Sequence, residues 1–200
     1  MTAPIDFYFD FSSPYGYIGA EEIDALAASY GRTVTWHPIL LGAIFKTTGG
    51  APLPSIPLKG DYALRDFPRL ARYHGLPFRQ PVNFPIATHN AARAFLWLRG
   101  QDPQLARNFA LACYRAYFAE GVDIADLAQV LNIAASLGVD ADALSAALNE
   151  PAVKELLKTE IETAMQRGVF GSPFFIVDNE PFWGSDRLPQ LEKWLETGGF

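Results

Sequence analysis

The alternation of apolar and polar positions predicts how the chain begins. Residues 5–11, IDFYFDF, place an apolar residue at every second position, which is the pattern of a half-buried strand. Residues 14–30 then carry apolar side chains at roughly helical spacing, and Gly31 follows as a stop. The next run, TVTWHPIL at residues 33–40, is rich in β-branched and aromatic residues, which favours a second strand. This pattern predicts a β-α-β unit.

The middle of the chain has a different pattern. Residues 42–60 contain several glycines and prolines and no sustained period, which predicts a long loop of a length usually kept for function. From residue 61 to residue 168 one helical pattern follows another. The predicted helix starts are Asp102-Pro103, Asp123, Asp140 and Glu150-Pro151, and Gly138 and Gly168 are typical of helix ends.

Strand character returns near the C-terminal end. The segment PFFIVDNEPFWG holds two short apolar runs around Asp178 and Asn179, whose residue types suit a hairpin turn. Ser185 is then expected to cap a final helix that carries leucines and Trp194 at helical spacing.

These elements predict an α/β fold with an inserted all-α subdomain. Strands at the two ends of the chain need each other to form a sheet, so two tandem domains are a poorer explanation. We predict one α/β domain of residues 1–60 and 169–200, and a helical subdomain of residues 61–168 between its β-α-β and α-β-β-α halves.

Composition excludes several classes of partner. The chain has 200 residues and a formal net charge of −6, and its basic residues are scattered, so we expect no nucleic-acid partner. We expect no membrane partner, because no long apolar run is present, and the N-terminal segment lacks the features of a signal peptide. Cys113 is the single cysteine, which excludes internal disulfides and thiolate zinc sites. We expect a cytoplasmic protein.

Two serines occupy the start of the first predicted helix. Ser12 and Ser13 precede Pro14, at the position where thioredoxin-like domains hold their redox cysteines. A helix N-terminus carries about half a positive charge and free N–H groups, which stabilise a nearby thiolate. The chain has no sulfur here and keeps a hydroxyl donor instead. Seen alone, a serine before a proline is most often a simple helix cap.

Two further motifs could bind a ligand. Pro173 in VFGSPFF opens a predicted strand, and a cis bond there would turn the backbone of Ser172 toward an extended peptide. In WGSDRL, Ser185 and Asp186 begin another helix that could receive a carboxylate, while Asp186 accepts an ammonium group. An ordinary turn and an ordinary cap would explain each motif separately; their occurrence in one chain favours a binding site.

The motifs together resemble a known family. FYFDFSSPYGY, HPILLG, PLKGDY, FGSPFF and FWGSDRL are similar to segments of the 2-hydroxychromene-2-carboxylate isomerases, which are relatives of the kappa-class glutathione transferases. Both groups are thioredoxin-like with a helical insertion, and the resemblance covers essentially the whole chain. It therefore implies a thioredoxin-like fold, glutathione as the cofactor, and a homodimer.

The resemblance also implies the roles of individual residues. Ser13 would stabilise the thiolate of glutathione, and Ser12 occupies a position that is often apolar in relatives. Ser172 and Pro173 would hold the cysteinyl part. The residues implied for the two ends of glutathione are Ser185 and Asp186 for the γ-glutamyl end and Lys59 for an anionic group at or near the glycyl end. Gly50 stands where the transferases carry an asparagine, so that contact is not carried over.

The implied reaction is the interconversion of 2-hydroxychromene-2-carboxylate and trans-o-hydroxybenzylidenepyruvate in the breakdown of aromatic compounds. The thiolate would add to a conjugated double bond, rotation would follow, and loss of the thiolate would restore the bond. A small aromatic carboxylate requires aromatic walls, for which Tyr15, Phe45 and Trp183 are candidates, and one cation, for which Lys59 is the candidate.

Other interpretations stay open or are less favoured. A kappa-like glutathione transferase would share the thiolate site and release a conjugate, and a non-catalytic thioredoxin-like module would bind a thiol or peptide only. A hydrolase triad is disfavoured because no GxSxG motif is present. We interpret Cys113 and the separated His37, His74 and His89 as structural or surface residues, and we predict no metal site.

Overall fold

A computed structural model describes residues 3–200 and shows one mixed sheet of four strands in the order β2-β1-β3-β4. The strands are β1 (Ile5–Phe9), β2 (Val34–Pro38), β3 (Phe174–Val177) and β4 (Glu180–Trp183). β1 pairs parallel with β2 and antiparallel with β3, and β3 pairs antiparallel with β4. Phe7 lies opposite both Trp36 and Phe175, so the N-terminal and C-terminal halves meet on the central strand.

Nine α-helices and three shorter helical turns are present in the described residues. The α-helices are α1 (Pro14–Ser29), α2 (Leu41–Thr48), α3 (Lys59–Tyr73), α4 (His89–Arg99), α5 (Pro103–Arg115), α6 (Leu127–Ser136), α7 (Ala141–Asn149), α8 (Pro151–Gln166) and α9 (Leu188–Thr197). The short turns are η1 (Leu53–Ser55), η2 (Ala116–Glu120) and η3 (Ser185–Arg187).

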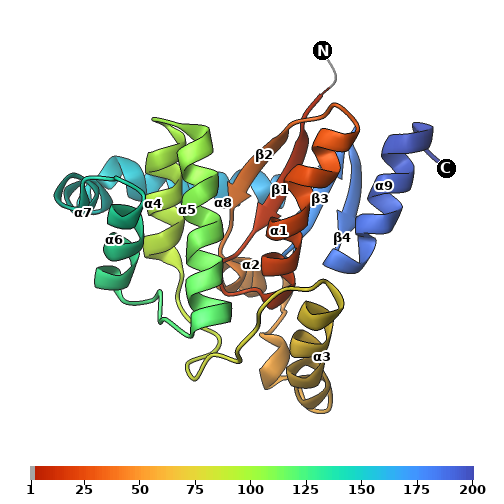
Figure 1. Ribbon diagram of the computed structural model, residues 1–200, viewed down its shortest axis with the longest axis horizontal. Coiled ribbons are helices and arrows are strands. Elements are labelled where there is room, and N and C mark those ends of the chain that lie inside the picture. Colours follow the sequence, from red (N-terminus) through yellow and green to blue (C-terminus); the bar gives the residue numbers. More distant parts are fainter. Residues whose placement is uncertain (1–2) are drawn as a thin grey trace.

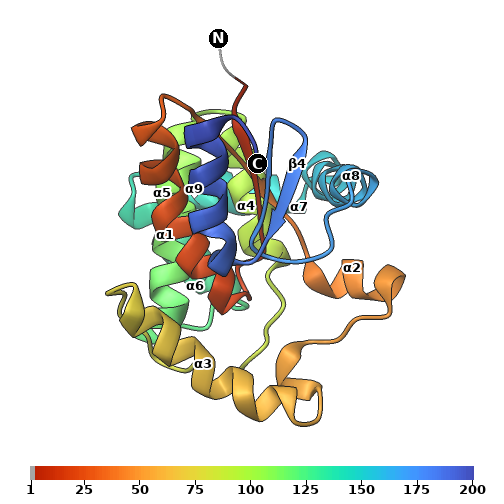
Figure 2. The same cartoon turned by 90° about the vertical axis from the view of Figure 1, so that its right-hand side faces the viewer.

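The helices surround the sheet on three sides (Figure 1). α1 and α9 cover one face of the sheet, and α8 lies on the other face (Figure 2). α4, α5, α6 and α7 stand beyond the β2 edge, while α3 lies below the start of α1. The N-terminal end of α1 therefore lies where the sheet meets the inserted helices α4 to α7.

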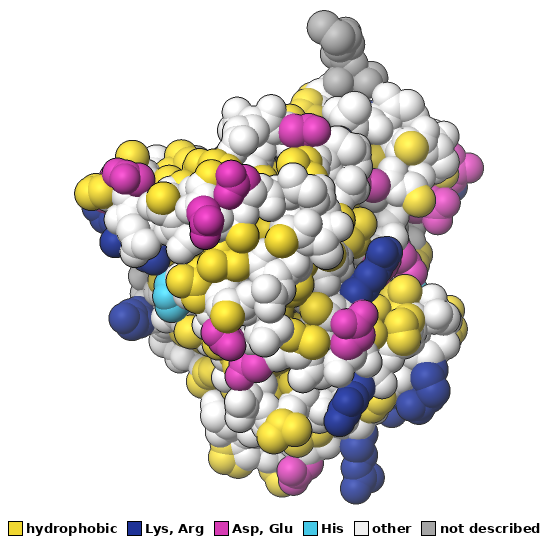
Figure 3. Space-filling view, turned by 60° about the vertical axis from the view of Figure 1, so that its left-hand side comes forward, with side chains coloured by type: hydrophobic (Ala, Val, Ile, Leu, Met, Phe, Trp, Pro, Cys, Tyr) yellow, Lys and Arg dark blue, Asp and Glu magenta, His cyan; other side chains and the backbone are white. Residues whose placement is uncertain are grey.

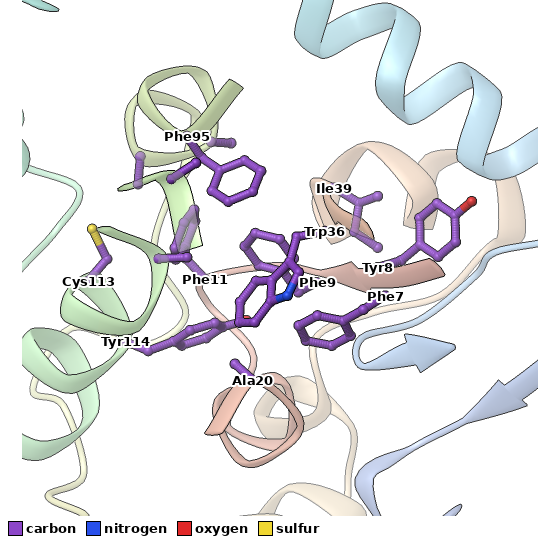
Figure 4. Close-up of a cluster of buried hydrophobic side chains, with 14 of the residues drawn as sticks. Phe7, Tyr8, Phe9, Phe11, Ala20, Trp36, Ile39, Phe95, Cys113 and Tyr114 are labelled. Carbon is purple, nitrogen blue, oxygen red and sulfur yellow. The ribbon is translucent and has the colours of Figure 1, made fainter. Parts of the chain in front are cut away.

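The core is built around the aromatic side chains of β1 (Figure 4). Phe7 and Phe9 are fully buried, and Phe7 packs edge-on against Trp36 with ring centroids 4.8 Å apart. Phe9 packs in the same way against Phe95 of α4 at 5.2 Å and lies beside Tyr114 of α5. Full burial of one such ring contributes about 2 kcal/mol. β1 therefore joins the inserted helices to the sheet through one continuous core.

Most local expectations are confirmed. The strand, the first helix with Gly31 just after it, the second strand and the hairpin are all present. Asp178 and Asn179 both adopt positive φ, at 51° and 69°, as the hairpin turn requires. The α/β fold with a helical insertion is the fold observed.

Three local expectations are wrong. Residues 42–60 are not one loop, because α2 and η1 lie within them and α3 already begins at Lys59. The α2 start is capped from a distance, since the Leu41 N–H donates to Asp10 Oδ2 at 2.7 Å. Asp123 does not start a helix; Asp126 caps α6. Ser185 makes no side-chain cap and is instead the first residue of η3.

The surface carries both signs of charge. Acidic and basic side chains are interspersed on the face shown in Figure 3, and that face has no continuous basic stripe. Within residues 3–200, no helix has the length and apolar character needed to cross a membrane.

A network of charged groups ties α8 to the sheet. His37 of β2 contacts Glu160 Oε1 through Nδ1 at 2.6 Å and Asp6 Oδ1 through Nε2 at 3.0 Å. Arg99 pairs with both oxygens of Glu160 at 2.9 Å, and Arg167 contacts Asp6 at 2.8 Å. The network therefore links β1, β2, α4 and the end of α8.

These contacts shift the pKa values of their members. Burial opposes the charged form of His37, but Asp6 and Glu160 outweigh it and raise the pKa above 6.5. Burial also opposes ionised Glu160, yet His37 and Arg99 lower its pKa to about 2. The pKa of Asp6 is lowered despite burial, because of His37 and Arg167.

Stability should therefore depend on pH in both directions. The raised pKa of His37 stabilises the fold fully below pH 6.5, and this contribution is lost as pH rises through the folded pKa. The lowered pKa of Glu160 stabilises the fold above pH 4.5, and this contribution is lost as pH falls toward about 2. We expect the contribution of the network to the free energy of unfolding to be largest between these limits, measured by urea unfolding across pH.

The variant His37→Gln tests the predicted loss of stability at higher pH. It should remove the loss of unfolding free energy that the wild type shows as pH rises above 6.5. Glu155→Gln is the matched control, because Glu155 lies on the same helix α8 in an exposed pair with Lys158. If His37→Gln loses as much unfolding free energy above pH 6.5 as the wild type, His37 is not the group responsible.

Candidate active site

The start of α1 holds Ser13 as its N-cap. Ser13 has extended backbone angles, and its Oγ accepts the N–H of Gly16 at 3.0 Å. Pro14 lacks an N–H, and the N–H of Tyr15 has no protein acceptor among residues 3–200. The first turn of α1 therefore presents one free backbone donor and the positive end of a 16-residue helix.

Ser13 is joined to the loop before β3. Its hydroxyl donates to the backbone carbonyl of Ser172 at 2.8 Å, although the two residues are 159 positions apart. The Ser172–Pro173 peptide bond is cis. Gly184 N–H donates to the Pro173 carbonyl at 3.0 Å, so the start of η3 lies against the same loop. The structure therefore brings together the segments around Ser13, Pro173 and Gly184, which are far apart in the sequence.

Asp10 organises the buried side of this junction. Asp10 is only 4 % exposed, and its carboxylate accepts the N–H of Ser12 at 2.9 Å, the N–H of Leu41 at 2.7 Å and the hydroxyl of Thr88 at 2.7 Å. Its own N–H donates to Ser172 Oγ at 2.9 Å. Burial raises the pKa of Asp10, and the three hydrogen bonds oppose that shift.

The packing beneath the helix start leaves little free space. Tyr114 donates to the Asp10 carbonyl at 2.9 Å. A Cβ at position 16 would come within 2.7 Å of the Tyr114 hydroxyl and 2.8 Å of Ser172 Oγ. Gly16 therefore allows the close approach of α1 to α5 and to the loop before β3.

Tyr15 links the helix start to α3. Its hydroxyl donates to Asp66 Oδ2 at 2.8 Å, and its ring packs edge-on against Phe67 at 5.2 Å. Burial raises the pKa of Tyr15, and the charges of Asp66 and Asp186 raise it further. η3 packs against α1, and the Asp186 side chain is 66 % exposed there.

The remaining candidates lie on three other elements and differ in exposure. Lys59 is exposed at the first position of α3 and makes no ion pair within residues 3–200. Trp183 is 55 % exposed at the end of β4 and covers Gly171, where a Cβ would overlap its indole. Phe45 is half-buried on α2, one turn after Leu41, and within residues 3–200 it makes no hydrogen bond or ring contact with Ser13 or Tyr15.

Several residues of the site were missed by the sequence interpretation. Asp10, Thr88, Tyr114 and Asp66 were not singled out. Asp10 bonds to Ser12 and Ser172, and Asp66 bonds to Tyr15. Thr88 and Tyr114 bond to Asp10. Asp10 alone had a usable signal, since it is an acidic residue at the end of a buried strand and directly before the serines. The partners of the other three depend on tertiary contacts.

Two surface hollows lie away from Ser13. One, of about 330 Å³, lies between α1, α9 and His74, and the other, of about 340 Å³, lies between β4 and α9 and includes Trp183. No group of three or more metal-ligating side chains occurs within the described part of the chain. Cys113 is fully buried in α5, and burial raises the pKa of its thiol, as expected of a core residue.

The fold and the site define a class of protein. A mixed sheet with helices on both faces, a serine-proline turn at the start of α1 and a cis-proline loop beside it form one arrangement. The family described as "DSBA-like thioredoxin domain" matches residues 4–196. The class is therefore the DsbA-like thioredoxin fold, as the motifs implied.

Relatives define the group within this class. The chain is 35% identical over 198 residues to a 2-hydroxychromene-2-carboxylate isomerase of Sphingobium xenophagum, covering 98% of this chain and 99% of the relative. It is 30% identical to the enzyme of the same name from Pseudomonas putida, covering 94% and 92%. The solved structure of such an isomerase is similar with a TM-score of 0.85 at 28% identity, covering 96% of this chain and 94% of that chain. The chain belongs to the 2-hydroxychromene-2-carboxylate isomerase family.

The kappa-class transferases are also relatives. The glutathione S-transferase kappa 2 of Caenorhabditis elegans is 28% identical over 204 residues, covering 96% of this chain and 91% of the relative. Both groups implied by the sequence motifs are therefore found among the similar proteins.

Removing the Asp10 carboxylate should destabilise the whole junction. Asp10→Ala leaves two backbone N–H groups and the Thr88 hydroxyl without their acceptor, and each such loss costs about 1–3 kcal/mol. We expect the free energy of unfolding to fall by about 3 kcal/mol or more in urea denaturation. Glu162→Ala on the exposed face of α8 is the control and should change it by less than about 0.5 kcal/mol. Equal effects of the two variants would contradict this role.

Proposed function

We propose that this chain is a glutathione-dependent isomerase that interconverts 2-hydroxychromene-2-carboxylate and trans-o-hydroxybenzylidenepyruvate. The observation that carries the proposal is the junction of Ser13 with the Ser172 carbonyl, at a helix start where redox relatives hold sulfur. The identity to isomerases over nearly the full length of both chains supports the same reaction.

The residues at the junction fit a thiol-bearing tripeptide. The loop at cis Pro173 offers the backbone of Ser172 for an extended peptide, in the manner of an added strand. Asp186 is exposed at the start of η3 and could accept the ammonium group of the γ-glutamyl end, beside Ser185. Lys59 is exposed and forms no ion pair within residues 3–200, so it could hold a carboxylate.

Ser13 would stabilise the sulfur as an anion. In the structure its single hydrogen is donated to the Ser172 carbonyl, so the hydroxyl must turn away from that carbonyl to reach a thiolate. The carbonyl is then available to accept an N–H from the bound peptide. The Tyr15 N–H and the positive end of α1 would favour the anion as well.

The cofactor supplies a nucleophilic thiolate, whose addition to and loss from a conjugated double bond permits rotation about that bond. The chain supplies the surroundings for an aromatic carboxylate. Trp183, which is exposed beside Gly171, and Tyr15 in the first turn of α1 are the candidate aromatic surfaces, and Lys59 would attract the negative charge. Phe45 remains a candidate wall on α2.

A kappa-like transferase is the second candidate, and the 28% identity to such an enzyme favours it. The two functions differ in the fate of glutathione, because an isomerase regenerates it and a transferase consumes it. Adding 2-hydroxychromene-2-carboxylate with catalytic glutathione should change the absorbance while total thiol stays constant. Falling thiol would favour the transferase, and no glutathione-dependent change would refute the isomerase.

The variant Ser13→Ala should raise the pKa of the bound thiol. Losing one hydrogen bond to a charged group costs about 1.5–3 kcal/mol, which corresponds to about one to two pKa units. We expect kcat/KM at neutral pH to fall by about ten- to a hundredfold, with a smaller loss of glutathione affinity. The thiolate absorbance, titrated against pH, measures the shift directly.

Ser29→Ala provides the matched control, because Ser29 lies at the far end of α1 and its hydroxyl donates only to the Leu26 carbonyl. Its thiol pKa and turnover should equal those of the wild type. If Ser13→Ala also leaves the thiol pKa unchanged, Ser13 does not serve the sulfur.

A further inference from the structure

A surface hollow of about 340 Å³ lies between β4 and α9. β4 is the last strand of the sheet, and α9 lies beside it at this edge (Figure 1). Small-molecule sites in proteins have volumes of about 300–1,000 Å³, so a compact ligand has room here. The hollow shares only Trp183 with the candidate residues of the site at Ser13.

Aromatic side chains form much of its wall. The ring of Trp194 packs edge-on against the buried Phe182 with centroids 6.0 Å apart, and against Phe200 at 5.8 Å. Phe200 is 75 % exposed, and Trp194 is half-buried. Exposed rings that border a hollow offer stacking and edge contacts to a planar aromatic ligand.

Hydrogen-bond donors line the hollow from the side of α9. Arg187, Gln190 and Trp194 follow one another at spacings of three and four residues, so they share one face of the helix. The buried Trp194 Nε1 has no hydrogen-bond partner within residues 3–200, although a buried indole N–H usually has an acceptor. A wall of donors favours a ligand that brings oxygen acceptors.

Arg187 gives the hollow a positively charged end. Its side chain is 44 % exposed, and within the described residues its one ion pair joins it to Asp186 at 3.4 Å, which is longer than a normal hydrogen bond. A guanidinium matches a carboxylate with two parallel hydrogen bonds and also stacks on aromatic rings. The one acidic lining residue, Glu180, begins β4, whereas Arg187 follows its end. The charge of the hollow therefore favours an anion at the η3 end.

We propose that the hollow between β4 and α9 is a binding site for a planar aromatic carboxylate. Arg187 pairs with the carboxylate, and the rings of Trp194 and Phe200 contact the aromatic part. An added strand from another protein is a poorer occupant, because Pro181 on this edge strand has no N–H to donate to it. The site is separate from the proposed function and requires no glutathione.

A matched pair of ligands tests the chemistry of the site. 2-Naphthoate and 2-naphthamide share one ring system, and only the first carries a charge. In calorimetry on the full chain without glutathione, the wild type should bind the naphthoate more tightly than the amide. Arg187→Gln should weaken binding of the naphthoate by about tenfold and leave binding of the amide unchanged. Lys193→Gln is the control, because Lys193 lies on the same helix in an exposed pair with Glu196, and it should bind both ligands as the wild type does.

A second charge-removing variant shows where the naphthoate binds. Lys59→Gln removes the cation assigned to the substrate carboxylate, and it should leave binding of the naphthoate unchanged. A loss of affinity in Lys59→Gln and not in Arg187→Gln would place the naphthoate at the site near Ser13 and overturn the proposal. Equal binding of the two ligands by the wild type, or binding of neither, overturns it as well.

The indole N–H signals in an NMR spectrum give an independent location. The signal of Trp194, identified by its absence from the spectrum of Trp194→Phe, should shift on titration with 2-naphthoate. The signal of Trp36 should stay in place, because this buried side chain donates to Asp24 at 3.1 Å. A Trp194 signal that does not move at saturating naphthoate would show that the hollow is not the binding site.

Failure of the proposed function gives a different result. In that case the wild type shows no glutathione-dependent turnover of 2-hydroxychromene-2-carboxylate, while binding of 2-naphthoate and its dependence on Arg187 remain. Failure of the present inference leaves that turnover intact.

Discussion

The site depends on one buried carboxylate at the end of the central strand. Asp10 accepts hydrogen bonds from the residue before the α1 cap, from the start of α2 and from the residue before α4. Its backbone adds contacts to α5 and to the loop before β3. A buried anion is costly unless it is hydrogen-bonded, so these five segments are held in one arrangement. The positions of Ser12, Ser13 and Ser172 follow from it.

The aromatic core surrounds the strand that leads to this junction. β1 is covered on both sides, and its rings contact β2, β3, α4 and α5 within one cluster. Elements from the beginning, middle and end of the chain therefore meet at one strand. The hydroxyl pair at the start of α1 follows the end of that strand, with Ser13 bonded to the loop before β3 and Ser12 bonded to the segment before α4.

Local signals predicted most elements, because each depends on neighbours along the chain. The caps at Ser13, Asp102 and Asp140 bond to residues two or three positions away. The prediction failed for α2, whose first N–H is bonded by a carboxylate 31 positions earlier. The glycines and prolines near α2 predicted a loop, but the hydrogen bond from Asp10 stabilises the start of the helix. The resemblance of the motifs was sufficient for the family and the fold class.

The sequence by itself determined the strand and helix order, the absence of sulfur before Pro14, and the three motifs that could bind a ligand. Only the tertiary structure decided which distant groups form hydrogen bonds with the serine hydroxyls. Ser13 and Ser172 are joined across 159 positions, and Ser12 is directed to Ile86 across 74. The physical reason is that a hydroxyl has a single hydrogen, and its acceptor is chosen by the folded surroundings rather than by the neighbouring residues.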